Sequence, residues 1–306
     1  MRMPSTLLKE FIVSLGGKAG STVEAYQREL WHFLDWISRR AGNSGPFSPQ
    51  QQLTKTALQT YMAYLQSENH SISHCARVKS AVGAFARWLI EEKELLRRNP
   101  ARGVELPPQP LLAPRELSAD QRYVLRSLVE RQEDARGEAL FALGYWAGCR
   151  ISDVAWLRME HLHIGPKVGW VHVGYKGGKT RDIDLLNSVR RPLYTYLQQG
   201  DRDQDSSFVF SSQRAARFTE AGIHHWFRSL KARANKEEWS LIDDITFHDL
   251  RHDFAHRARA AGWTIEEVAY YLGHVTKKGT PAIQTTARYT QVSRERVKDK
   301  LRLISG

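Results

Sequence analysis

The sequence of 306 residues has few cysteines and no long apolar run. Its two cysteines, Cys75 and Cys149, match no metal-binding spacing and exclude a disulfide framework, so we expect reduced thiols in a cytosolic protein. No apolar run approaches the roughly 20 residues that a membrane helix needs. The N-terminal residues also lack the apolar segment of a signal peptide. We therefore expect a cytoplasmic protein without a membrane partner.

Acidic residues are too few to balance the basic ones, and this is the first positive indication of function. Lysine and arginine total 45 against 33 aspartates and glutamates, which gives a net charge of +12. The excess is spread along the chain, since residues 1–99 hold 13 basic and 8 acidic residues and the remainder hold 32 and 25. Such a distribution favours a polyanionic partner, most often nucleic acid.

Prolines gather in one segment of the chain. Five of the eleven lie between Pro100 and Pro114. Proline fixes φ and has no N–H donor, so this segment is predicted to be extended and not helical. The chain is also too long for most single cores. We therefore predict a helical domain over 1–99, a Pro-rich linker over 100–117 and a second domain over 118–306.

Apolar residues at helical spacing dominate the first domain. Ser21 and Glu24 have the spacing of a capping box. Arg77, Lys79 and Arg87 lie among apolar residues of the last helix, where they either contact DNA or form a solvated face. With a short helix near 7–15, three apolar stripes predict a compact four-helix domain: Tyr26, Leu30, Phe33, Leu34 and Ile37; Leu58, Tyr61, Met62 and Leu65; Val78, Val82, Phe85 and Leu89.

The second domain combines helices with a short run of strands. Ser118 is predicted to cap a helix, and an apolar helix follows over about 138–147. Residues 168–175 alternate like a strand, a pair of glycines suits a tight turn, and 180–185 read as the return strand. Helices fill most of the rest, up to a last one near 294–303. The predicted fold is mainly α with a small β-hairpin or sheet.

Several residues of this domain could do chemistry, although each alone has an ordinary explanation. Arg150 follows a turn between two helices, and Lys176 lies at the predicted hairpin tip. An arginine near a helix end and a lysine in a turn are usually only solvated. His248 and Arg251 are three residues apart, so they share one helix face and are predicted to project together into a cleft.

Two further patterns leave alternatives open. His248, His252 and His256 recur every four residues, but no carboxylate accompanies them, so no metal is expected. Towards the end of the chain, His274 follows a glycine that ends a predicted helix, and Tyr289 lies 15 positions later. Taken alone, the histidine could be a helix cap and the tyrosine a packing residue.

The order of these residues resembles that of the tyrosine recombinases, the lambda-integrase class. The resemblance covers nearly the whole chain and is greatest to compact Xer-like and transposon-encoded members, although the segment from His274 to Tyr289 is longer than in Xer-like members. It is carried by Gly-Cys-Arg150-Ile-Ser-Asp, Lys176-Gly-Gly-Lys-Thr-Arg, His248-Asp-Leu-Arg251-His, Leu-Gly-His274 and Tyr289.

The resemblance implies that Tyr289 attacks a DNA phosphodiester and forms a 3′-phosphotyrosyl link. Metal-free cleavage needs positive charge on the non-bridging oxygens, and Arg150 and Arg251 supply planar donors that never lose their charge. A free phenol has a pKa of about 10, so the tyrosine needs a base, and His248 has that role.

The same resemblance assigns the remaining roles. Lys176 protonates the departing 5′-oxygen and is preferred over Lys179. His274 donates to the phosphate, and Asp153 orients the site and supports His248. Because the covalent link conserves the bond energy, no cofactor is expected.

The implied assembly is four protomers on two double-stranded DNA sites, joined through a Holliday junction. Each protomer would hold duplex DNA in a C-shaped clamp, and a helix from Ser293 onward would dock on its neighbour. The target sequence, and whether the element is a transposon, phage, plasmid or chromosome, stay open. A type IB topoisomerase and a DNA-binding protein without catalysis are the alternatives.

Overall fold

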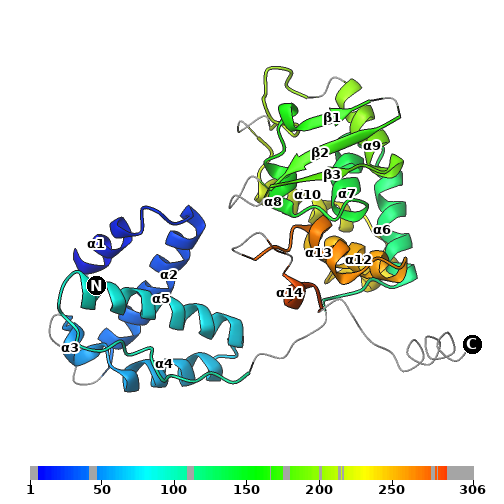
Figure 1. The fold of residues 1–306 in the computed structure, drawn as a ribbon. Helices are drawn as coiled ribbons and strands as arrows, with labels where there is room; N and C mark the ends of the chain where they lie inside the picture. The colour runs from blue at the N-terminus through cyan, green and yellow to red at the C-terminus, as the bar shows by residue number, and fades with distance from the viewer. Residues whose placement is uncertain are drawn as a thin grey trace, which may run out of the picture. The chain divides into compact units, whose positions relative to one another are not determined.

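The computed structural model describes residues 6–40, 47–108, 114–165, 167–174, 180–199, 202–212, 215, 217–276, 280 and 282–287. The chain divides into two compact units, Met1–Pro110 (unit 1) and Leu111–Gly306 (unit 2). In Figure 1 the colours of unit 1 run from blue to cyan and those of unit 2 from green to orange. No helix in the described ranges is both long and apolar enough to cross a membrane.

Unit 1 is a bundle in which the predicted apolar stripes form the core. Phe33, Leu58 and Val82, one from each stripe, are fully buried. The rings of Phe11 and Phe85 meet edge to face with centroids 5.2 Å apart, so the first helix packs on the last. The helices described are α1 Thr6–Ser14, α2 Gly20–Ser38, α3 Pro49–Gln52, α4 Lys55–Ser67 and α5 Ile72–Glu91.

Side chains cap the N-termini of two helices of unit 1 but not that of a third. The side chains of Thr54 and Ser71 accept the N–H groups of Ala57 and His74 and so cap α4 and α5. The prediction of a cap at Ser21 is wrong. Helix α2 begins one residue earlier, at Gly20, and no side chain caps it, so Ser21 lies inside the first turn.

Unit 2 confirms the predicted fold class, mainly α with one small sheet. Ser118 caps α6, as the sequence indicated, and Gln121 completes a capping box with it. The described elements are α6 Ala119–Gln132, α7 Ala135–Tyr145, α8 Ile151–Ala155, the 3₁₀ helix η1 Met159–His161, β1 Leu162–Ile164, β2 Gly169–Val173, β3 Arg181–Asp184, α9 Asn187–Gln198, α10 Glu220–Lys231, α11 Lys236–Ile242, α12 Phe247–Ala260, α13 Ile265–Leu272 and α14 Ile283–Ala287.

The sheet is antiparallel with strand order β1-β2-β3. The predicted hairpin is β2 and β3, in which Val171 pairs with Ile183 and both side chains are fully buried. The third strand, β1, was not predicted, because a strand of three residues carries too little alternation to detect. Figure 1 shows the sheet at one end of unit 2 and α12–α14 at the other.

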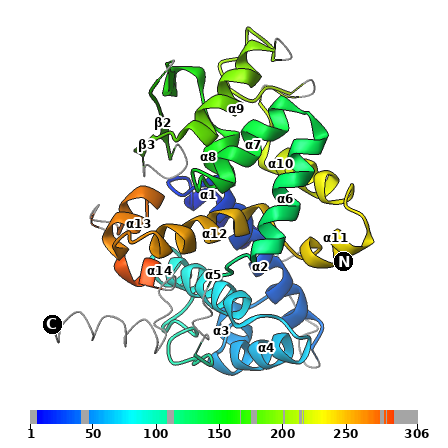
Figure 2. The same cartoon turned by 90° about the vertical axis from the view of Figure 1, so that its right-hand side faces the viewer.

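A glycine turn brings three helices together below the sheet. Gly148 has a φ of +59°, and a Cβ there would lie 2.7 Å from Phe254 of α12 and 2.9 Å from Leu272 of α13. Only glycine allows this backbone conformation together with this close approach. The chain after α7 therefore runs against both helices. Figure 2 shows α12 between α6 and α13, the position from which it presents residues to the site.

Candidate active site

Arg251 is a deeply buried residue of the site, with 1% of its surface exposed. It lies on α12, and its guanidinium donates to the carbonyl of Gly148 at 2.7 Å and to that of Leu272 at 2.6 Å. Its Nη2 also lies 3.0 Å from Nε2 of His274. A buried charge without partners would be strongly unfavourable, so these acceptors are what make the position tolerable.

Three arginines converge on one helix end. The carbonyls of Tyr271, Leu272 and Gly273, consecutive residues at the C-terminus of α13, each accept from a different guanidinium. The donors are Arg181, Arg251 and Arg150, in that order, at 2.7, 2.6 and 3.0 Å. The carbonyl end of a helix carries partial negative charge, which offsets repulsion between the cations.

Asp153 supplies the negative side chain of the cluster and is 5% exposed. Its carboxylate accepts the backbone N–H of Arg150 at 3.1 Å and Nη2 of Arg181 at 3.1 Å. These two bonds fasten the start of α8 to the start of β3. One carboxylate among three guanidiniums leaves the site positive, which suits an anion such as a phosphate.

His274 joins this cluster and is held neutral by it. Burial, and then the charges of Arg251 and Arg150, lower its pKa to about 3. Gly273 makes the turn that places it, because this glycine ends α13 in the left-handed conformation with a φ of +63°. On the other side of the ring, Nδ1 of His274 lies 3.0 Å from the hydroxyl of Thr286, the buried residue of α14.

His248 begins the same face of α12 one turn before Arg251 and stays exposed. Its ring meets that of His252 edge to face with centroids 4.4 Å apart. Partial burial, followed by the charge of Arg251, lowers the pKa of His248 below its usual value. A neutral, solvent-facing imidazole beside a cationic site can accept a proton from an attacking group.

Two predicted site residues cannot be placed. Lys176 falls in residues 175–179 and Tyr289 in residues 288–306, both outside the described ranges. The described chain ends with α14 at Ala287, two positions before Tyr289. The predicted last helix near 294–303 and parts of the segment between His274 and Tyr289 lie outside as well.

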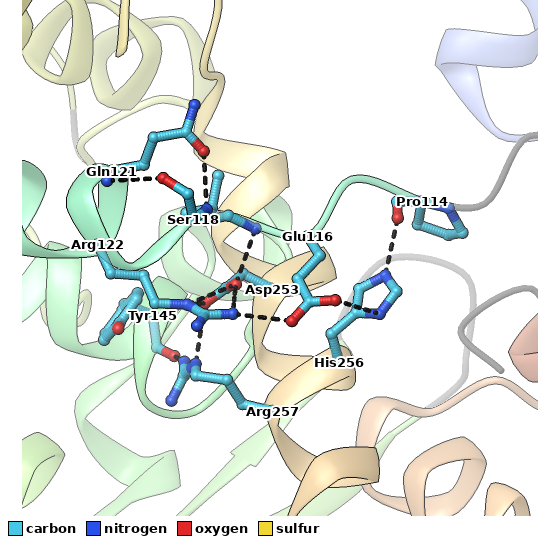
Figure 3. A network of polar contacts seen from close by, with 10 residues as sticks. Pro114, Glu116, Ser118, Gln121, Arg122, Tyr145, Asp253, His256 and Arg257 are labelled. Atoms are coloured by element: carbon cyan, nitrogen blue, oxygen red, sulfur yellow. Dashed lines mark hydrogen bonds and ion pairs between the residues drawn. The ribbon is translucent and has the colours of Figure 1, made fainter. Parts of the chain in front are cut away.

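Asp253 holds the back of α12 and was not singled out from the sequence. It is fully buried, and its carboxylate accepts from Nη2 of Arg122 at 2.7 Å, Nε of Arg257 at 2.9 Å and the backbone N–H of Leu117 at 3.1 Å. Figure 3 shows this network running to Glu116 and on to His256. It fixes the chain before α6 to the helix that carries Arg251.

Lys231 fixes the start of the same helix. Its ammonium is buried at the end of α10 and donates to the carbonyls of Ile242 at 3.0 Å, Asp243 at 2.7 Å and Ile245 at 2.7 Å. Three N–H groups meet three acceptors, which is the full donor capacity of an ammonium. The turn between α11 and α12 is thereby set directly before His248.

Of the site residues that were not predicted, only some left a signal in the sequence. Arg181 stands in the quoted Lys-Gly-Gly-Lys-Thr-Arg run, at the strand position that alternates inward with Ile183, so a buried role was readable there. Asp253 is a charge on the face of α12 that turns away from the site. Thr286 carries no distinguishing pattern, because its partner His274 lies twelve positions away on another element.

The surroundings of the α12 histidines and of the cysteine beside Arg150 bear on metal and thiol chemistry. In the residues that the structure describes, no group of three histidine, cysteine or carboxylate side chains could hold a metal ion. Nε2 of His256 instead donates to the carbonyl of Pro114 at 2.7 Å. Cys149 adjoins Arg150, but burial raises the pKa of its thiol to about 12, so it is not a nucleophile at neutral pH.

Comparison with known sequences identifies the family that this geometry fits. The model described as phage integrase family matches residues 116–296, more than half of the chain, and that of the phage integrase N-terminal SAM-like domain matches residues 8–93. The tyrosine recombinase XerD of Vibrio cholerae is 28% identical over 288 residues, covering 92% of this chain and 89% of that protein. XerD of Listeria monocytogenes is 26% identical over 296 residues, 94% of each chain.

Solved structures share the fold at lower identity. The integrase of the Tn1549 transposon, in complex with transposon right end DNA, superposes with a TM-score of 0.72 at 17% identity over the full length of both chains. The XerH site-specific recombinase bound to its difH substrate gives 0.68 at 14% identity over 91% of this chain and 78% of its own. The predicted resemblance to tyrosine recombinases is therefore confirmed.

Proposed function

The chain belongs to the phage integrase family and is a tyrosine site-specific recombinase, and we propose that it cuts and rejoins duplex DNA at the cluster of Arg150, Arg251 and His274. The observation that carries this proposal is the convergence of permanently charged guanidiniums around one helix end. Such donors stabilise the charge that builds on a phosphate as it is attacked. In comparable sites one such donor lowers the barrier by about 3 kcal/mol.

The proposed reaction has two transesterification steps. The phenol oxygen of Tyr289 forms a bond to phosphorus while the bond from phosphorus to the 5′-oxygen breaks. His248 takes the phenol proton, and Lys176 gives a proton to the departing 5′-oxygen. A 5′-hydroxyl of a partner strand then reverses these events and releases the tyrosine. The number of phosphodiester bonds is conserved, so no cofactor enters.

His274 and Asp153 support the phosphate site in this proposal. His274 is a neutral imidazole, so it can donate one hydrogen bond to a phosphate oxygen without adding a charge. Asp153 keeps Arg150 and Arg181 in place through its two hydrogen bonds. The roles of Lys176 and Tyr289 rest on the family pattern alone, whereas those of His274 and Asp153 also rest on the contacts described above.

The assembly that we propose is four protomers on two double-stranded DNA sites. Residues 1–99 form a core-binding domain, 100–117 a linker and 118–306 the catalytic domain, and the two domains clamp the duplex. The net charge of +12 suits such a partner, because phosphate contacts supply most of the affinity for DNA. The segment from Ser293 onward docks on the neighbouring protomer.

The test is covalent capture on a nicked duplex that carries the recombination site, found by selecting DNA that the protein retains from a random pool. After cleavage, the short fragment between the cut and the nick diffuses away with its 5′-hydroxyl, so religation is prevented. The phosphotyrosyl adduct then accumulates and is counted on a denaturing gel. Tyr289→Phe should bind the duplex and give no adduct. Tyr270→Phe, at a tyrosine that is 69% exposed on α13, is the matched control and should react normally.

Two outcomes would overturn the proposal. Persistence of the adduct in Tyr289→Phe would place the nucleophile elsewhere, and absence of an adduct in the unaltered protein would leave only DNA binding. A second assay with two sites separates recombination from relaxation. Holliday junctions are expected, whereas relaxed circles without junctions would indicate a topoisomerase.

A further inference from the structure

A side-chain hydrogen bond joins the cluster of cations to α14. Nδ1 of His274 lies 3.0 Å from Oγ1 of Thr286, a residue with no exposed surface. A backbone bond accompanies it, because the N–H of Ala282 donates to the carbonyl of His274 at 2.6 Å. Thr286 precedes Tyr289 by three positions, so this contact is where the phosphate site meets the segment that carries the nucleophile.

The direction of each hydrogen bond follows from the groups involved. A guanidinium can only donate, so Nε2 of His274 accepts from Arg251. The neutral imidazole then carries its one proton on Nδ1 and donates it to Oγ1 of Thr286. The hydroxyl donates in turn to the carbonyl of Ala282, 3.3 Å away. The chain of donors therefore runs from the phosphate site into α14.

We propose that Thr286 is a positioning residue that couples the tyrosine segment to the phosphate site and stabilises His274 in either tautomer, whereas Arg251 sets the resting one. This rests on the proposed function, since it concerns the same cleavage. In the structure, Nε2 is occupied by Arg251 and cannot donate to a phosphate. The site is thus held in a resting arrangement for as long as no phosphate draws the Arg251 N–H away.

Phosphate binding would reverse the chain of donors. When a phosphate oxygen accepts the Arg251 N–H, Nε2 of His274 is freed. Water takes the proton from Nδ1 and returns a proton to Nε2, so the imidazole stays neutral and now donates to the phosphate. The hydroxyl of Thr286 rotates away from Ala282 and donates to Nδ1. A hydroxyl can serve both tautomers because it both donates and accepts, whereas an isosteric methyl can serve neither.

The experiment compares three variants in single-turnover cleavage of the nicked duplex at saturating protein. Thr286→Val keeps the shape and removes the hydroxyl, Thr286→Ser keeps the hydroxyl, and Thr285→Val removes a hydroxyl from the exposed neighbouring position of the same helix. We expect Thr286→Val to cleave about tenfold to a hundredfold more slowly with unchanged DNA affinity. Thr286→Ser and Thr285→Val should stay within about threefold of the unaltered protein.

A second measurement applies to the unaltered protein and does not depend on any variant folding. Nitrogen NMR shifts of histidine-labelled protein, with the His274 signals assigned through His274→Gln, should show the proton on Nδ1 without DNA and on Nε2 with DNA bound. A proton on Nε2 in the free protein would overturn the proposal, as would wild-type cleavage by Thr286→Val. An adduct in Tyr289→Phe would instead overturn the proposed function and leave the tautomer result standing.

Discussion

Units 1 and 2 bury different kinds of side chain. Among the described residues, unit 1 buries only Glu29 and Gln52 of the charged or amide type. Unit 2 buries polar or charged residues throughout: Asp153, Arg181, Arg202, Ser211, Lys231, Arg251, Asp253, His256, His274 and Thr286. Unit 1 is therefore stabilised chiefly by apolar contact, whereas unit 2 also depends on buried polar groups that need hydrogen-bond partners.

This difference shows what the site requires of its scaffold. Each well-buried leucine or phenylalanine of unit 1 contributes about 1.5–3 kcal/mol and tolerates substitution of similar volume. The arginines of unit 2 are held by backbone carbonyls and carboxylates. Removing one partner therefore leaves a buried polar group without its hydrogen bond, and this lowers the stability. Unit 2 should be the more fragile part of the molecule, and the following substitutions test that expectation.

Asp253→Ala is expected to give the largest loss of stability. It removes a fully buried carboxylate from between Arg122 and Arg257, and breaking a buried charge network in this way costs about 3–5 kcal/mol. Glu29→Ala in unit 1 should cost only about 1–2 kcal/mol, because its nearer partner, Arg28, is 60% exposed and returns to water, and its second partner, His74, lies 3.8 Å away. Denaturant unfolding, with hydrogen exchange resolved by peptide, reports each unit. Equal losses of stability in the two variants would mean that the two units do not differ in this way.

Arg251→Ala should separate chemistry from binding. Losing one transition-state donor slows cleavage about 10²–10³-fold, or about 3–4 kcal/mol. The fold is weakened too, because the carbonyls of Gly148 and Leu272 lose their partner. Arg150→Ala should slow cleavage similarly and perturb the fold less, since its side chain is only partly buried. Arg87→Ala, at an exposed arginine of unit 1, is the control in single-turnover cleavage at saturating protein. If Arg150→Ala and Arg251→Ala weakened binding as much as cleavage, the arginines would be ordinary phosphate anchors.

Acid should destabilise unit 2 before unit 1. The folded-state pKa of His274 is lowered to about 3 and that of His252 to about 4, so between about pH 4 and 6.5 the unfolded chain binds more protons than the folded one. The stabilisation is present above pH 6.5 and is lost as the pH falls, by up to about 1.4 kcal/mol per pH unit for each histidine. In unit 1 the pKa of His74 is lowered by burial, but Glu29 offsets part of this.

The check on this pH dependence is hydrogen exchange of the two units at pH 7 and pH 5. Protection of α12 and α13 should fall more than that of α2 and α5. His274→Gln and His252→Gln should each flatten the pH profile of unit 2. A profile that is unchanged in both variants would mean that other groups, such as the carboxylates, govern acid unfolding.

Local signals predicted much of the fold. The alternation of Val171 and Val173 indicated the hairpin, and Ser118 indicated the start of α6. These features are encoded within three or four residues, so one stretch of sequence is enough to read them.

The site was predictable only in part, because its partners are distant and many are backbone atoms. Arg150, Arg251 and His274 were found through family motifs, and the structure brings them together. That Arg181 would donate to the carbonyl of Tyr271, 90 positions away, could not be read, since every residue type has a carbonyl. Asp253 likewise binds Leu117 across 136 positions.

The smallest expected effect compares two serines that look alike in sequence. Ser118 caps α6, and its hydroxyl accepts the N–H of Gln121 at 3.1 Å, so Ser118→Ala should cost about 1 kcal/mol. Ser21 lies inside the first turn of α2 and caps nothing, so Ser21→Ala should change stability by less than about 0.5 kcal/mol. Thermal and denaturant unfolding of the two variants, prepared and measured together, provide the comparison. A loss of about 1 kcal/mol in Ser21→Ala would show that α2 begins at Ser21 in solution and would restore the capping box that the sequence indicated.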